Sequence, residues 1–118
     1  MKESIVAEKA FSFALRIIKL YKYLIKEKCE FVISKQLLRS GTSIGANIEE
    51  ARYAQSRKDF ISKLSISLKE SAETMYWLKL LRDSKEVNDY YLKDVIKECD
   101  EIIRMLSSIV KSSKERKT

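Results

Sequence analysis

Hydrophobic residues recur three or four positions apart along almost the whole chain, which is the spacing of amphipathic helices packed into a bundle. Short polar stretches divide this pattern into four segments, which predict helices over about residues 4–26, 34–55, 57–82 and 88–111. Connections this short make consecutive helices antiparallel neighbours. We therefore expect one all-α domain over residues 1–118, an antiparallel up-down-up-down four-helix bundle with a basic tail at 112–118.

Each segment contains a series of residues at the spacing expected of a core face. The four series are Phe11, Ala14, Ile18, Tyr21 and Ile25; Leu37, Gly41, Ile44, Ile48 and Ala51; Ile61, Leu64, Leu68, Ser71, Met75 and Leu78; and Leu92, Val95, Cys99, Ile102, Leu106 and Ile109. Ser34 and Ser56 stand at positions favoured for helix N-caps. Further apolar residues, such as Leu15 and Leu80, exceed what one stripe per helix requires, so we expect a homo-oligomer.

The composition agrees with a helical protein that is soluble in the cytoplasm. The 118 residues are 45% hydrophobic and 35% charged, with no proline and two glycines. The longest uncharged run, Ser40–Ile48, is too short to cross a membrane, and the first residues show no apolar signal segment. Cys29 and Cys99 match no zinc or redox spacing, and we expect both thiols to be free.

Both glycines, Gly41 and Gly45, lie in the second predicted helix. Each weakens helix formation by roughly 1 kcal/mol relative to alanine, so their presence indicates that another backbone or a bulky side chain approaches closely.

Ser43, Asn47 and Glu50 follow at spacings of four and three, on one side of the same helix. Two interpretations are open. These residues form a polar contact that fixes subunit register or receives a partner, or they bond to neighbouring helices within the bundle. In the second case Glu50 pairs with a basic residue. Ser71 and Glu73, on the third predicted helix, are then candidate hydrogen-bond partners for this polar face.

The stretch from Gln36 to Glu50 resembles the signature of bacterial four-helix-bundle proteins called 23S ribosomal RNA intervening-sequence proteins. The stretch from Ser56 to Glu73 is similar to that family's third helix. Ala51 stands where the family has glycine, which favours a straighter and longer second helix. The matching positions that we single out are Arg39, Gly41, Ser43, Gly45, Asn47, Glu50, Ser71 and Glu73.

The resemblance implies a bundle that assembles into a ring, since pentamers are known in the family, and it implies no enzymatic activity. A related branch, the accessory variability determinant of diversity-generating retroelements, works with a reverse transcriptase and binds nucleic acid through a basic surface. By analogy with this branch, we expect a comparable role here.

The net charge of +7 favours an acidic partner, with RNA or DNA first. The first predicted helix carries no acid between Glu8 and Glu27, and Tyr23 offers a stacking surface beside its basic residues. This helix and the tail are predicted to form one electropositive zone. Its candidate nucleic-acid-binding residues are Lys9, Arg16, Lys19, Lys22, Lys26, Lys111, Lys114, Arg116 and Lys117.

The sequence gives little indication of catalytic activity. The chain contains no histidine, which removes the commonest general base and metal ligand, and no phosphate-binding or dinucleotide motif is present. The acidic run Glu98–Glu101 is interpreted as a solvated face. We therefore expect no enzymatic activity, no metal and no cofactor. The alternative to nucleic-acid binding is a structural or protein-binding scaffold without an anionic ligand.

Overall fold

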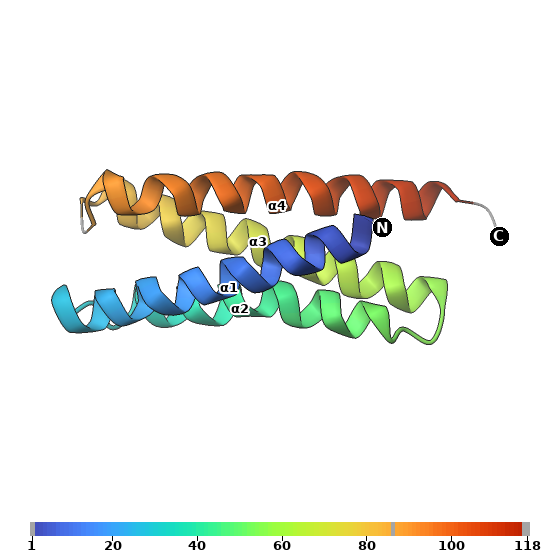
Figure 1. The fold of residues 1–118 in the computed structure, drawn as a ribbon, viewed down its shortest axis with the longest axis horizontal. Helices are drawn as coiled ribbons and strands as arrows, with labels where there is room; N and C mark the ends of the chain where they lie inside the picture. Colours follow the sequence, from blue (N-terminus) through green and yellow to red (C-terminus); the bar gives the residue numbers. More distant parts are fainter. Residues whose placement is uncertain (1, 86, 117–118) are drawn as a thin grey trace.

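The computed structural model describes residues 2–85 and 87–116 and contains four helices in sequence: α1 (Lys2–Glu27), α2 (Ile33–Arg52), α3 (Arg57–Asp83) and α4 (Asp89–Glu115). They run alternately up and down in a rod of 51 × 20 × 19 Å (Figure 1). The predicted all-α, antiparallel four-helix bundle is therefore confirmed.

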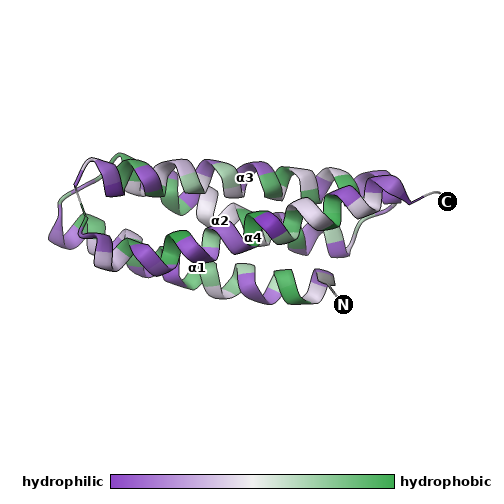
Figure 2. Cartoon of the chain, turned by 90° about the horizontal axis from the view of Figure 1, so that it is seen from above, coloured by the Kyte–Doolittle hydropathy of each residue, from purple (hydrophilic) through white to green (hydrophobic). Residues whose placement is uncertain are grey.

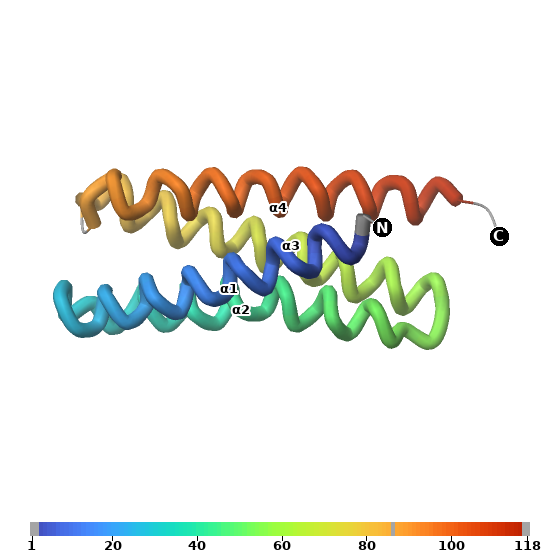
Figure 3. Tube along the Cα trace, in the orientation of Figure 1, coloured from blue at the N-terminus to red at the C-terminus, as the bar shows by residue number. Residues whose placement is uncertain are grey.

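Each helix packs against its two neighbours in the order α1, α2, α3, α4 and back to α1. The contact between α1 and α4 is the sparsest of the four. The start of α1 and the end of α4 lie toward the same end of the rod, as the tube in Figure 3 shows. The connections that follow α1 and α3 lie together at the opposite end (Figure 1).

The start of α2 is held by the carboxylate of Glu30. Its oxygens accept hydrogen bonds from the backbone amides of Val32, Ile33 and Ser34 at 3.2, 3.0 and 2.6 Å. The prediction of Ser34 as N-cap was wrong, because Ser34 is buried inside the helix and its hydroxyl donates to the carbonyl of Glu30. The backbone reaches this point through Cys29, which has a left-handed φ of 51°.

The other helix ends follow ordinary capping rules. Ser56 caps α3 as expected, since its hydroxyl accepts from the amide of Asp59. Asn88 does the same for α4 through the amide of Tyr90. Helix α2 ends at Arg52, three residues before the predicted end at 55, so Ala51 does not lengthen it.

Helix α1 carries two heptad series that are offset by one residue. The structure buries the series Val6, Ala10, Phe13, Ile17, Leu20 and Leu24. The series predicted to face inward was the wrong one: Phe11 is 68% exposed, and Ala14, Ile18, Tyr21 and Ile25 are half-buried. With Ala7, these residues form a continuous apolar line on the surface, which we call the outer heptad stripe. One residue corresponds to a turn of 100° around a helix, so the two series face different directions.

The remaining inward predictions agree with the structure to different degrees. Every residue named for α2 and α4 is buried. On α3 the predicted residues Leu64, Ser71 and Leu78 are buried, whereas Ile61, Leu68 and Met75 lie at the margin of the core face. Ser67, Thr74 and Leu81 complete that face. Hydrophobic and hydrophilic segments alternate along every helix (Figure 2), as expected where one face of each helix is buried and the others meet solvent.

Candidate functional site

Two basic residues of the predicted zone on α1 are engaged by acids of α4. Lys9 Nζ lies 3.2 Å from Glu101 Oε1, and Arg16 Nε lies 3.5 Å from Glu98 Oε2. Because α1 and α4 are antiparallel neighbours, their facing charges meet along the seam. These two cations are therefore partly neutralised within the bundle.

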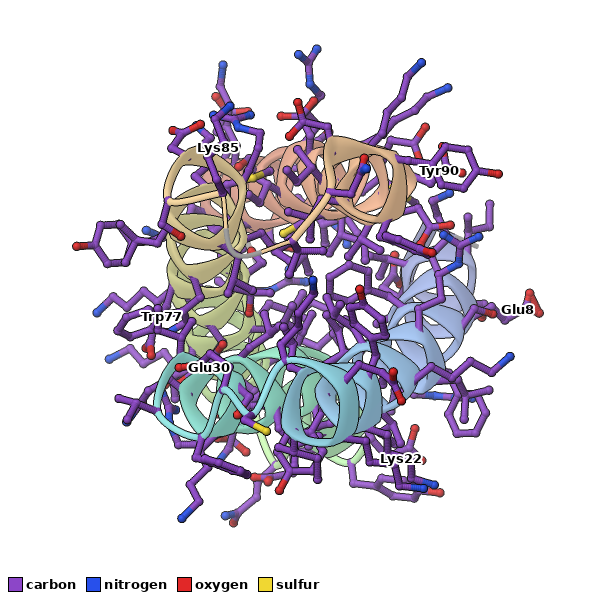
Figure 4. The ribbon with its side chains drawn as sticks, turned by 90° about the vertical axis from the view of Figure 1, so that its left-hand side faces the viewer. Glu8, Lys22, Glu30, Trp77, Lys85 and Tyr90 are labelled. Atoms are coloured by element: carbon purple, nitrogen blue, oxygen red, sulfur yellow. The ribbon has the colours of Figure 1, made fainter. Side chains whose placement is uncertain are left out.

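Lys19, Lys22 and Lys26 occupy the following turns of α1 and are exposed. Among the described residues, none of the three forms an ion pair. Seen along the bundle, Lys22 projects outward at the lower edge of the molecule, whereas Tyr90 lies at the upper right and Trp77 at the left (Figure 4). Among the described side chains of α1, these three lysines are the basic residues without an ion-pair partner.

The basic residues of the tail do not join this group. Lys111 and Lys114 lie in the last turns of α4, and Arg116 follows its end. That end of the rod is opposite the end where α1 finishes after Lys26 (Figure 3). Lys117 lies outside the described residues. The single electropositive zone expected from the sequence is thus divided between the two ends of the bundle.

A groove of about 380 Å³ opens between α1 and α4, next to the free lysines. Tyr23 and Tyr91 form one part of its wall, with ring centroids 5.3 Å apart and an angle of 32° between the rings. Tyr90 stands edge-on to Tyr91 at 5.7 Å. The complete lining is Arg16, Lys19, Leu20, Tyr23, Tyr91 and Val95. Basic side chains, the half-buried ring of Tyr23 and the exposed ring of Tyr91 therefore meet in one place.

The motif residue Arg39 joins α2 to α3 through two carboxylates. Its guanidinium pairs with Glu70 at 3.2 Å and with Glu73. Glu73 also accepts a hydrogen bond of 2.9 Å from the indole Nε1 of Trp77. The bond from Trp77, followed by that from Arg39, lowers the pKa of Glu73 below its usual value. This network stabilises the ionised carboxylate at the surface of the α2–α3 seam.

Ser43 and Asn47 bond within their own helix. The Ser43 hydroxyl donates to the carbonyl of Arg39 at 2.6 Å, and Asn47 Nδ2 donates to the carbonyl of Ser43 at 2.9 Å. The interpretation that they bond to neighbouring helices was therefore wrong in the described chain. The pairing expected for Glu50 is present, since Lys63 of α3 lies 2.9 Å away.

Sequence reasoning missed the buried polar contacts that cross between helices. Ser67 donates to the carbonyl of Ile44 at 2.7 Å, Thr74 donates to Ser40 Oγ at 2.9 Å, and Cys99 donates to the carbonyl of Ser71 at 3.4 Å. The motif residue Ser71 also donates to Leu68 of its own helix. The sequence feature that indicates these contacts is the spacing of Ser67, Ser71 and Thr74, which stand four and three residues apart on α3.

The acidic run on α4 is divided among separate partners. Glu98 and Glu101 pair with α1, Asp100 pairs with Arg104 at 2.8 Å, and Cys99 is buried between them. Across the described ranges, no group of three potential metal ligands comes together. None of the described helices is both long enough and apolar enough to span a membrane.

Comparison with known proteins places this chain among relatives of the same architecture. Residues 2–108 match the family model described as 23S rRNA-intervening sequence protein. The chain is 52% identical to a crystallised protein of unknown function from the S23 ribosomal protein family of Bacteroides thetaiotaomicron VPI-5482. That match has a TM-score of 0.91 and covers 94% of this chain and 99% of the other. No curated protein matches.

Proposed function

The chain belongs to the family of 23S rRNA-intervening sequence proteins, and from this starting point we propose that it is a non-enzymatic, homo-oligomeric protein that binds nucleic acid. The binding surface is the exposed side of α1 that carries Lys19, Lys22 and Lys26. The observation that supports this proposal is that these three cations have no ion-pair partner in the described chain, whereas Lys9 and Arg16 do. A nucleic-acid-processing protein bound to the same nucleic acid is compatible with this role.

Free lysines on one helix face are suited to a phosphate backbone. Each lysine that approaches a phosphate displaces condensed counterions, so binding weakens as salt rises, with a slope of roughly 0.7 to 0.9 log units per phosphate. Paired cations contribute less, because binding must first break or share the existing ion pair. The proposed surface is therefore the end of α1 near its C-terminus, without the distant tail.

Self-association is proposed through the outer heptad stripe. Phe11 is 68% exposed and Leu15 beside it is 51% exposed, which is unusual for large apolar residues on one helix face. Ala7 and Phe11 also line a groove of about 680 Å³ together with Glu49 and Arg52 of α2. Heptad spacing is the pattern that packs one helix against another. By the family resemblance the assembly is a ring, with five copies as the expected number.

A scaffold that binds only protein is the second candidate, supported by a second apolar surface. Tyr76 is 57% exposed on α3, Leu80 is 36% exposed, and Ile66 is 38% exposed. This surface lies on a different helix from the free lysines. It is suited to a protein partner and offers no particular attraction for phosphate.

Charge reversal at the lysines distinguishes the two candidates. We expect the wild-type protein to shift mixed RNA or single-stranded DNA in a salt-sensitive manner, and Lys19→Glu/Lys22→Glu/Lys26→Glu to abolish the shift. The matched control is Lys58→Glu/Lys69→Glu/Lys79→Glu, which changes the net charge equally at exposed positions of α3. The control should retain binding. Equal loss in both triple variants, or no wild-type binding near physiological salt, would overturn the proposal.

We also expect the protein to function in the cytoplasm. Cys29 is an exposed free thiol, and exposed free thiols persist in a reducing compartment.

A further inference from the structure

The groove between α1 and α4 combines features that phosphate binding alone does not require. Tyr91 is 53% exposed and Tyr90 is 80% exposed, although burying an aromatic ring is favourable. Tyr23 and Tyr91 come from different helices, so their tilted arrangement, with 32° between the ring planes, is produced by the fold and not by local sequence. A surface that bound only phosphates through lysines would not require these aromatic rings.

From this juxtaposition we infer that the groove is a stacking site for unpaired nucleotides, so that the protein prefers single-stranded to duplex nucleic acid. Bases stack on aromatic side chains through faces that are accessible only when the strand is unpaired. Duplex bases present only their edges to a groove of this kind. The inference rests on the proposed nucleic-acid binding and adds the form of nucleic acid that is bound.

The charges around the rings fit a strand that passes along α1. Lys19 lies in the groove lining, and Lys22 and Lys26 continue from it toward the end of the helix. Glu98, the acid nearest the Arg16 side of the groove, already has its carboxylate beside Arg16. Asp94 lies one turn after Tyr91 and is exposed, so the favourable path for phosphates lies on the α1 side.

The volume of the groove is consistent with a small number of bases. Ligand sites that hold a small molecule measure about 300 to 1,000 Å³, and this groove measures about 380 Å³. The rings of Tyr23 and Tyr91 therefore provide a wall against which a base can stack, while Tyr90 stands edge-on to Tyr91 outside the groove lining.

The test measures fluorescence anisotropy with four labelled probes of equal length: oligo(U) RNA, oligo(dT), an abasic deoxyribose-phosphate strand and a DNA duplex. The abasic strand keeps its phosphates but has no bases to stack. We expect oligo(U) and oligo(dT) to bind more tightly than the abasic strand and the duplex. Comparison of the first two probes shows whether RNA or DNA is the better ligand.

Tyr91→Ala should weaken binding of both base-containing single strands about tenfold, as expected for the loss of one stacked base. It should leave the abasic and duplex affinities and the salt slope unchanged. Tyr91→Phe should bind like the wild type. The matched control is Tyr53→Ala, because Tyr53 is an exposed tyrosine at the end of α2, away from the groove. Circular dichroism establishes that each variant folds.

The outcomes separate this inference from the proposed function. Salt-sensitive binding that is equal for all four probes and unaffected by Tyr91→Ala overturns the stacking site and leaves the lysine surface intact. Absence of binding to every probe overturns both. Preference for base-containing single strands that is lost in Tyr91→Ala and kept in Tyr53→Ala supports the stacking site.

Discussion

A methyl group added to Gly41 would lie 2.9 Å from both γ-carbons of Ile17, so α1 and α2 are in contact here at a distance that only glycine permits. Gly45, one turn further along α2, faces Ala10, and a methyl group there would lie 3.6 Å from the nearest atom. Two glycines that look equivalent in sequence thus meet very different neighbours.

Alanine substitution should distinguish the two glycines. We expect Gly41→Ala to lower the free energy of unfolding by about 1 to 3 kcal/mol, because the buried Ile17 cannot move away without disturbing the core. Gly45→Ala should raise it by up to about 1 kcal/mol through improved helix propensity. Chemical denaturation followed by circular dichroism measures both values. Equal effects of the two substitutions would contradict this account.

A double-mutant cycle tests the contact itself. Ile17→Ala alone should cost about 2 to 5 kcal/mol, as expected for truncating a large buried side chain. In the Gly41→Ala background the same truncation should cost less, since it relieves the clash. Strict additivity of the two substitutions would show that Gly41 and Ile17 do not constrain each other.

The two heptad series of α1 explain which parts of the fold could be predicted. Helices α2 and α4 each carry one dominant apolar stripe, and their core faces follow from the sequence. On α1, Phe13 and Phe11 belong to stripes of similar hydrophobicity, so periodicity alone does not select the buried one. The choice depends on how α2 and α4 pack against the helix, which the pattern within α1 does not contain.

The candidate site was predictable to a similar extent. Local spacing identified Lys19, Lys22 and Lys26 as neighbours on one helix face. It did not reveal that Lys9 and Arg16 meet acids of α4 that lie 92 and 82 residues later, nor that Tyr91 approaches Tyr23 from α4. These contacts between α1 and α4 depend on how the helices pack. The hydrophobic and charge pattern within a single helix does not determine them.

The carboxylate of Glu30 should make a pH-dependent contribution to stability. Partial burial favours its protonated form, but hydrogen bonds from the amides of Ile33, Ser34 and Val32 outweigh this and lower its pKa below the usual 4.5. A lowered pKa means that the stabilisation is present above pH 4.5 and is lost as the pH falls through the value in the folded protein. Glu30→Ala should cost about 1 to 2 kcal/mol at neutral pH.

Comparison with Glu30→Gln isolates the charge. The glutamine variant keeps an acceptor but does not titrate, so its difference in unfolding free energy from the wild type should shrink as the pH is lowered from neutral to about 3. Urea denaturation at several pH values provides the measurement. A difference that stays constant over this range would show that ionisation of Glu30 does not contribute to the cap.

The two cysteines should differ sharply in reactivity. Burial, and to a smaller extent the charge of Asp100, raises the pKa of Cys99 to about 12, whereas Cys29 is exposed in the α1–α2 connection. Because the thiolate is the reactive form, a thiol reagent at pH 8 should modify Cys29 rapidly and Cys99 only after unfolding. Titration should therefore give one thiol per native chain and two in denaturant, and Cys29→Ser should react only when unfolded. Rapid reaction of both thiols in the native protein would contradict the burial of Cys99.

The outer heptad stripe should control self-association. A charge at Phe11 would have to be buried without a partner in an assembled interface, which is costly, while in the isolated chain this position is already in contact with water. We therefore expect the wild type to be an oligomer in light scattering at micromolar concentration, and Phe11→Glu to have the 13.8 kDa mass of a single chain. Tyr53→Glu introduces the same charge at a 79% exposed aromatic residue outside the stripe and should leave the assembly unchanged. A monomeric wild type, or a Phe11→Glu variant that keeps the wild-type mass while remaining folded, would refute the assignment of the stripe as the subunit interface.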